Sequence, residues 1–113
     1  MDRNFIQSFI AGELKNGEIK PFNTQGTWSS FQKAYTVNLI FWNFSEAILI
    51  DDSAFGFKVQ TEIYNPGWVV ITSNPADLFR VYFVIEDTLI ECKDDIYITD
   101  LRQVIHDVIL PEN

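Results

Sequence analysis

The sequence predicts a single α+β domain, built as one antiparallel sheet of about five to six strands in a meander, with an N-terminal and a C-terminal helix packed on one face. Three observations predict it. Apolar residues recur at helical spacing near both ends of the chain, and short apolar or alternating segments fill the middle. The connections between those middle segments are only a few residues long, so consecutive strands must be antiparallel neighbours.

The composition is that of a folded protein. The chain has 113 residues, of which 47% are hydrophobic and 15% aromatic, and disordered chains lack such apolar content. We expect one domain over residues 1-113. The lone cysteine, Cys92, closes no disulfide within the chain. The start of the chain does not have the pattern of a signal peptide, and no apolar run approaches the roughly 20 residues that span a bilayer. We therefore predict a cytoplasmic location and no membrane contact.

The first element is predicted to be a helix over residues 2–15. Its apolar positions share one stripe, and Asp2 suits the positive end of the helix dipole. Gly17 is expected to end it, because glycine accepts the left-handed conformation of a helix terminus. Residues 18–27 are predicted to form a loop. The apolar positions of the stripe are Phe5, Ile6, Phe9, Ile10 and Leu14.

Residues 28–44 fit two patterns. Trp28, Phe31, Tyr35, Leu39 and Trp42 lie on one face of a helix, whereas Tyr35, Val37, Leu39 and Phe41 alternate as in a strand. The β-branched and aromatic content favours a strand over residues 34–43, preceded by a helical turn over 28–33.

Five strands and a final helix are predicted in the rest of the chain. Residues 47–51 form a short strand that ends in a turn. Residues 57–63 alternate as a half-buried strand, and a type II turn with Gly67 at its third position leads into the strand 68–72. The apolar strand 79–85 is expected to be central, and a turn at Glu86 and Asp87 leads into the strand 88–92. A final helix over residues 100–110 is expected to be capped by Thr99 and ended by Pro111.

The charge of the chain is unevenly placed. The net charge is −8, and residues 51–113 contain twelve acidic residues against four basic ones, whereas residues 1–50 are balanced. Phosphate backbones and anionic membranes repel such a surface, which argues against direct binding of nucleic acid. A basic protein is attracted and steered instead.

The residue types do not indicate catalysis. His106 is the only histidine and has no carboxylate placed to orient it, and Cys92 is interpreted as a small apolar or spectator residue. The acidic pairs lack the spacing of a calcium loop, and neither a nucleophile motif nor a phosphate loop is present. We therefore predict no enzyme activity, no cofactor and no metal site.

The remaining features favour a non-catalytic acidic binding protein that occludes a basic protein partner. We expect the later carboxylates to form one continuous anionic face. The size, acidity and predicted layout resemble those of bacterial immunity proteins, which neutralise toxins, although no motif carries the resemblance. A nuclease toxin is one candidate partner, because carboxylates can mimic the phosphates that a nuclease binds. The predicted interface consists of Glu86, Asp87, Glu91, Asp94, Asp95 and Asp107, with Trp42 and Trp68 as aromatic anchors.

Two alternatives remain open. A curved sheet crossed by a helix can enclose an apolar ligand pocket, here lined by Trp28, Phe31, Tyr35 and Trp68. An exposed edge strand over residues 47–51 could instead pair with its own copy, which would make the chain an assembly subunit.

Overall fold

A five-stranded antiparallel sheet organises the chain. The structure is a computed structural model that describes residues 2–111. Its strands follow one another in the order β1-β2-β3-β4-β5, so the predicted α+β meander is confirmed. The strand over residues 79–85 is internal, as expected, with a neighbour on each side, and β3 is the middle strand. The strands are β1 (Glu46–Ile50), β2 (Ala54–Val59), β3 (Gly67–Ser73), β4 (Phe79–Ile85) and β5 (Thr88–Ile96).

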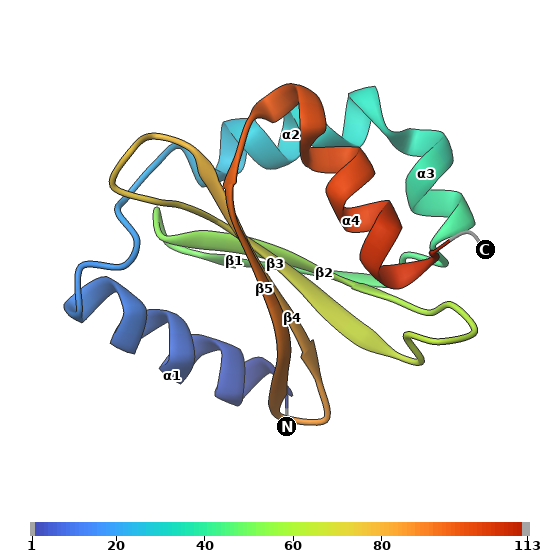
Figure 1. Cartoon of the computed structure of the whole chain (residues 1–113), viewed down its shortest axis with the longest axis horizontal. Coiled ribbons are helices and arrows are strands. Elements are labelled where there is room, and N and C mark those ends of the chain that lie inside the picture. The colour runs from blue at the N-terminus through green and yellow to red at the C-terminus, as the bar shows by residue number, and fades with distance from the viewer. Residues whose placement is uncertain (1, 112–113) are drawn as a thin grey trace.

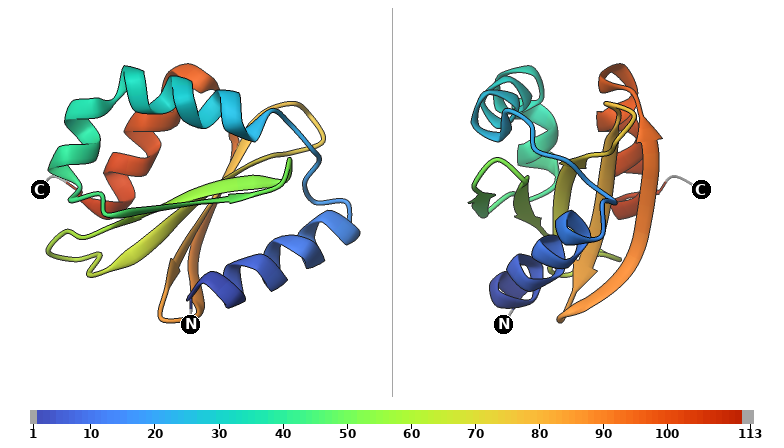
Figure 2. Two further views of the ribbon diagram at one scale, coloured as in Figure 1. Left: turned by 180° about the vertical axis from the view of Figure 1, so that it is seen from behind. Right: turned by 90° about the vertical axis from the view of Figure 1, so that its left-hand side faces the viewer.

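Helices cover both faces of the sheet. Figures 1 and 2 show α1 on one side and the other three α-helices on the opposite side. The expectation that both terminal helices pack on one face is therefore wrong. The physical reason lies in β3, which is buried at every position and so needs cover on both sides. The helices are α1 (Asp2–Lys15), α2 (Thr24–Ala34), α3 (Thr36–Phe41) and α4 (Leu101–Ile109), with a 3-10 turn η1 (Ile98–Asp100) before α4.

Each face of the sheet has its own hydrophobic core. On the α1 side, Ile6 and Ile10 pack into a cluster that contains Trp68, Val70 and Tyr82. On the side of α2, α3 and α4, the larger core is rich in aromatic rings. It includes Trp28, Phe31, Trp42, Phe55, Phe57, Val69, Ile71, Val81, Phe83, Leu101 and Ile105. Because side chains alternate along a strand, neighbouring residues of β3 belong to different cores.

Two helices, α2 and α3, occupy residues 24–34 and 36–41, so the predicted strand over 34–43 is wrong. The side chain of Asn23 accepts a hydrogen bond from the backbone N–H of Gly26 at 2.9 Å and caps α2. Tyr35 leaves helical geometry, with φ −125° and ψ 35°, and separates α2 from α3. The helical face that holds Leu39 and Trp42 is the buried one.

Gly17 follows the end of α1 and Gly67 begins β3, and glycine is needed at the two positions for different reasons. Gly17 has φ 76° after α1, as predicted for a helix terminus. Gly67 does not have a positive φ, so the predicted type II turn is wrong. A Cβ atom at Gly67 would overlap the ring of Tyr64. Position 67 therefore needs glycine because an aromatic ring lies against the backbone.

Several element boundaries differ from the prediction: α2 begins at Thr24 inside the predicted loop, β2 begins at Ala54, and β5 continues to Ile96. The strand β2 ends at Val59 because the next residues bond elsewhere. The backbone N–H of Gln60 donates to the Trp42 carbonyl at 2.9 Å, and the Thr61 hydroxyl donates to the Ile109 carbonyl. The helix α4 begins after η1, and the residue at its N-cap position, Asp100, makes no side-chain capping bond. Thr99 therefore lies within η1 and does not cap α4.

Candidate functional site

Six carboxylates lie along one edge of the sheet. We call this set the acidic edge, and all six residues are exposed. The edge strand β5 is exposed at every position except its last. Two members stand in the turn between β4 and β5, three on β5 and one on α4. They are Glu86 and Asp87, then Glu91, Asp94 and Asp95, and finally Asp107.

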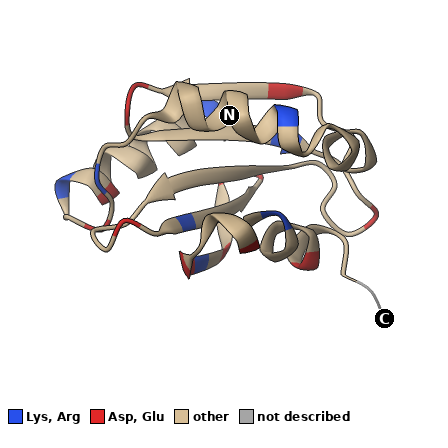
Figure 3. Cartoon of the chain, turned by 90° about the horizontal axis from the view of Figure 1, so that it is seen from above, with Lys and Arg blue, Asp and Glu red and all other residues tan. Residues whose placement is uncertain are grey.

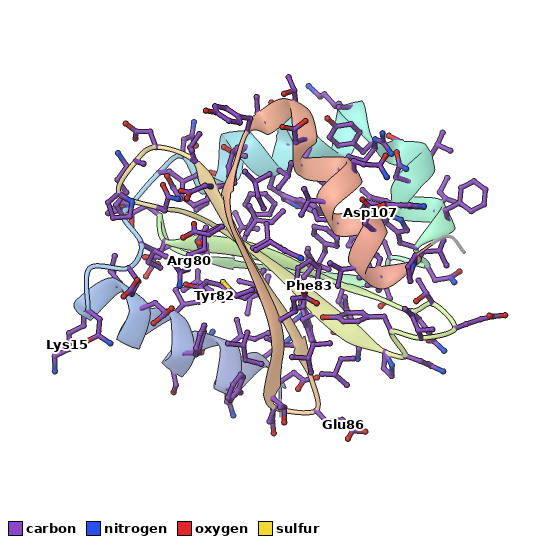
Figure 4. The ribbon with its side chains drawn as sticks, in the orientation of Figure 1. Lys15, Arg80, Tyr82, Phe83, Glu86 and Asp107 are labelled. Atoms are coloured by element: carbon purple, nitrogen blue, oxygen red, sulfur yellow. The ribbon has the colours of Figure 1, made fainter. Side chains whose placement is uncertain are left out.

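The acidic edge is a row and not the one continuous anionic face that the sequence predicted. Glu86 stands at the tip of the β4–β5 hairpin, far from Asp107 on α4 (Figure 4). At least two of the six carboxylates have cationic partners, since Lys93 lies 3.0 Å from Glu91 and Arg80 lies 2.9 Å from Asp94. Figure 3 shows acidic and basic residues on several elements. The negative field along β5 is therefore reduced at two points.

The turn that carries Glu86 and Asp87 is a two-residue hairpin. Both residues have positive φ, 48° and 57°, which matches the twist of the flanking strands. Ile85 pairs with Thr88 directly beside the turn. The backbone N–H of Asp87 donates to the side chain of Asp2 at 2.7 Å. The first turn of α1 thus holds the hairpin tip and keeps both carboxylates at the surface.

A β-bulge places Asp94 and Asp95 side by side. The register shifts between Phe79 and Val81, and Asp95 takes a positive φ of 53°. The amide of Asn74 donates to both carboxylates at 2.8 Å. Burial alone would raise the pKa of Asp94, but the hydrogen bonds from Asn74 and the Asp95 backbone, together with the charge of Arg80, hold that pKa below its ordinary value.

Arg80 gathers the acidic groups on the α1 side of this bulge. Its guanidinium lies within 4 Å of carboxylate oxygens of Glu13, Glu18 and Asp94 and stacks over the ring of Tyr82 at 5.4 Å. The Tyr82 hydroxyl donates to Glu13 at 2.6 Å. Arg80 could not be identified from the sequence, because the bulge that brings it opposite Asp94 depends on strand register and not on local pattern.

On the other side of β5, Glu91 and Asp107 line the same shallow hollow. It measures about 330 Å³ and is also lined by Lys93, Val104 and Val108. The side chain of Gln103 donates to Asp107 at 2.7 Å, one helical turn away. This hollow joins α4 to the edge strand and makes Asp107 part of the acidic edge.

The two predicted aromatic anchors are not at the surface. Trp42 is 0% exposed and Trp68 is 2% exposed. Trp42 stacks on Phe57 in the larger core, and Trp68 lies beneath the guanidinium of Arg3 at 5.4 Å. Neither indole can contact a partner in this conformation. Both stand next to chain turns, which suggested exposure, but Trp42 lies on the buried side of α3 and Trp68 lies in β3, which is buried at every position.

The neighbours of Cys92 and of His106 do not activate either side chain for catalysis. Cys92 is exposed in the middle of β5, not at a strand end as predicted. Partial burial is the main reason why the pKa of the Cys92 thiol is raised. The charge of Arg80 lowers that pKa, and the carboxylates of Asp94 and Glu13 raise it. Adjacent strand residues point to opposite faces, so Lys93 does not activate it. His106 accepts a hydrogen bond at Nδ1 from the indole of Trp42.

A groove of about 520 Å³ lies between α2 and the segment that enters α4. Phe31 and Tyr35 line it, as the ligand-binding alternative predicted. Trp28 lies in the larger core and Trp68 in the core on the α1 side of the sheet, so neither lines this groove. The other lining residues are Asn23, Gly26, Thr27, Ser30, Ala34, Phe79 and Ile98.

The opposite edge strand, β1, is less open than the assembly alternative requires. The guanidinium of Arg3 donates to the Ala47 carbonyl at 3.4 Å and lies 3.3 Å from the Glu46 carboxylate. Just beyond β1, the backbone N–H of Phe22 donates to the Asp52 carbonyl at 2.8 Å. Part of this edge is therefore occupied by the chain itself.

Residues 2–111 contain no cluster of histidine, cysteine or acidic side chains arranged to hold a metal ion. No helix in this range is long and apolar enough to cross a bilayer. Comparison of the chain with protein-family models, curated proteins and solved structures finds no match. The fold and the acidic edge therefore define the chain only as an α+β meander domain with an exposed, carboxylate-lined edge strand.

Proposed function

We propose that this chain is a non-catalytic binding protein that occludes a basic protein partner with its acidic edge. Its most concrete form is a toxin-neutralising immunity or inhibitor protein of the bacterial cytoplasm, with a nuclease toxin as partner. The observation that supports the proposal is the exposure of all six carboxylates along an edge strand. A protein surface that ordinarily binds phosphates is positively charged. A row of carboxylates presents the negative charges that such a surface attracts.

The geometry favours recognition by charge over addition of a partner strand to β5. The pairing of β4 with β5 has two register irregularities, and Lys93 stands on the edge. Bulges and lysines are features that disfavour strand-to-strand association. The nine residues of β5 extend over roughly 30 Å, since a strand rises about 3.3 Å per residue. That length lets carboxylates contact several cationic groups of one partner.

The proposal is tested by affinity capture from the native host, followed by a salt series on the captured protein. A basic protein should be retained, and its affinity should fall as the salt concentration rises, because carboxylate–cation attraction is screened. Retention of a neutral or acidic protein, or binding that salt does not weaken, would overturn the proposed mechanism.

A matched pair of variants separates the acidic edge from net charge. The edge variant carries Glu86→Gln, Asp87→Asn and Asp107→Asn. The control carries Asp51→Asn, Asp52→Asn and Glu62→Gln, three exposed acids outside the edge. Both variants change the net charge equally. Only the edge variant should weaken partner binding, by about tenfold or more. Equal losses would show that overall charge and not the edge binds the partner.

The groove beside α2 favours a second candidate, a module that binds a small apolar ligand. Its volume of about 520 Å³ falls within the range of ligand pockets, about 300 to 1,000 Å³. Mass spectrometry of the native chain purified from its host should then detect a bound small molecule. A Ser30→Phe variant, which fills the groove, should lose it. Purified chain without any ligand would count against this candidate.

A further inference from the structure

The shallow hollow between β5 and α4 combines charged and apolar walls. Its strand side is formed by Glu91 and Lys93, which stand two residues apart and so share one face of β5. Its helix side is formed by Val104, Asp107 and Val108, which stand three and four residues apart and so share one face of α4. The hollow therefore offers two carboxylates from two different elements beside an apolar helical stripe.

The charges that line the hollow favour one added cation. Glu91 and Asp107 carry two negative charges and Lys93 carries one positive charge, so the lining has a net charge of −1. Lys93 lies 3.0 Å from Glu91 and is already paired with it. Asp107 has a neutral partner instead, since it accepts a hydrogen bond from Gln103 at 2.7 Å. A single added positive charge makes the lining neutral, whereas an anion is repelled.

The apolar wall of the hollow indicates what kind of cation fits. Val104 and Val108 are half-buried and pack against the larger core, and they offer contact to a hydrocarbon stem rather than to a bare ion. Two carboxylates are also too few for calcium, which takes about six to eight oxygen ligands. A guanidinium suits the hollow better than an ammonium does. Its planar fork can donate to more than one carboxylate, and it is more weakly hydrated beside apolar surface.

We propose that this hollow receives one arginine side chain of the basic partner. The stem of the arginine lies against the two valines, and its guanidinium is shared by Glu91 and Asp107. The inference rests on the proposed function, in which the acidic edge meets a basic protein, and it names the group that the edge recognises. Lys93 competes with the arginine, so the incoming guanidinium replaces Lys93 as the partner of Glu91. The hollow thereby selects arginine, whereas carboxylates on an open turn attract any cation.

A capped amino acid tests the hollow without the partner. Nuclear magnetic resonance follows the backbone amides of the chain while N-acetyl-arginine N-methylamide is added to about 20 mM, which detects a Kd in the millimolar range. Saturable shifts should appear in residues 91–93 and 104–108. The matching lysine compound carries the same charge and should bind at least about threefold more weakly. Equal binding of the two compounds, or shifts that do not include both β5 and α4, would overturn the proposal.

Two lysine variants test the competition for Glu91. Lys93→Met removes the competing cation and should increase the affinity for the capped arginine by about twofold to fivefold, the effect of one surface ion pair. Lys58→Met is the matched control, since Lys58 lies 3.5 Å from Glu46 on another part of the sheet. It removes the same charge and should leave the affinity unchanged. Misfolding does not strengthen binding, so the expected gain is specific. Equal effects of the two variants would contradict the competition.

Val108→Phe fills the hollow and should abolish the binding of the capped arginine, with circular dichroism to check that the variant folds. The same variant should weaken binding of the captured partner by about tenfold, as expected for a central side-chain contact. Failure to capture a basic protein from the host overturns the proposed function alone. If a basic protein is captured and neither Val108→Phe nor Lys93→Met changes its affinity, the arginine site is overturned and the proposed function stands.

Discussion

The indole N–H of Trp42 donates to Nδ1 of His106 at 3.2 Å, which joins the end of α3 to the middle of α4. The indole is completely buried and stacks nearly parallel to Phe57. His106→Phe keeps a ring at this position but removes the acceptor. It should lower the free energy of unfolding by about 1 to 2 kcal/mol, because a buried donor is left without a partner. Urea denaturation measures the change.

A double-mutant cycle separates this hydrogen bond from packing. Trp42→Phe and His106→Phe are measured singly and together. The coupling energy should be about 1 kcal/mol, the net value of a typical hydrogen bond. Strictly additive effects would show that the contact between Trp42 and His106 contributes nothing beyond its shape.

Gly67 and Gly12 should respond oppositely to alanine. A Cβ atom at Gly67 would overlap the Tyr64 ring, whereas one at Gly12 meets nothing within 4 Å. Gly67→Ala should therefore destabilise the fold by about 1 to 3 kcal/mol. Gly12→Ala, within α1, should stabilise it by about 0.5 to 1 kcal/mol. Thermal unfolding of both variants checks the pair. A neutral Gly67→Ala would mean that the Tyr64 ring does not lie against this backbone.

Because of Tyr64 and Tyr82, we predict that the fold loses stability in alkali. Burial raises the pKa of Tyr64 and of Tyr82, and the hydrogen bond to Glu13 raises that of Tyr82 further. A raised pKa in the folded state means that the stabilisation is complete below the ordinary value of 10.0 and is lost as the pH rises above it. Urea midpoints should fall from pH 9 to pH 11. The double variant Tyr64→Phe, Tyr82→Phe should be less stable at pH 7 but show a flatter pH dependence. An equal slope would contradict this account.

Because of Asp94, we predict that the fold loses stability in acid. Its folded-state pKa is lowered, so its contribution is present above the ordinary value of 3.8 and is lost as the pH falls through the folded-state value. Asp94→Asn should be less stable than wild type at pH 6, and the difference should shrink towards pH 3. Asp52→Asn, on the β1–β2 turn, is the control. A difference that stays constant with pH would show that Asp94 acts through its shape and not through its charge.

The periodicity of apolar residues was sufficient to predict the first helix and the apolar strand over residues 79–85. The helix 2–15 followed from its apolar stripe, and the strand 79–85 from its apolar run. The error at residues 34–43 has a specific cause. Val37, Ile40 and Phe41 are apolar but exposed, so α3 lacks the polar outer face that distinguishes an amphipathic helix. The alternation of Tyr35, Val37, Leu39 and Phe41 then imitates a strand.

Features set by tertiary structure were not predictable in this way. The run from Trp68 to Thr72 contains apolar residues of both cores, which requires cover on both faces but does not say which helix lies on which face. The pairing of Arg80 with Asp94 depends on a bulge that sequence pattern does not fix. The sequence located the carboxylates of β5 but not their partial neutralisation.

Amide hydrogen exchange of the chain with and without its captured partner tests the central claim most directly. If the acidic edge occludes a basic protein, the amides of residues 86–95 should exchange more slowly in the complex, while those of β1 on the far edge should be unchanged. Protection confined to β1, or to the groove beside α2, would contradict the proposed role of the acidic edge.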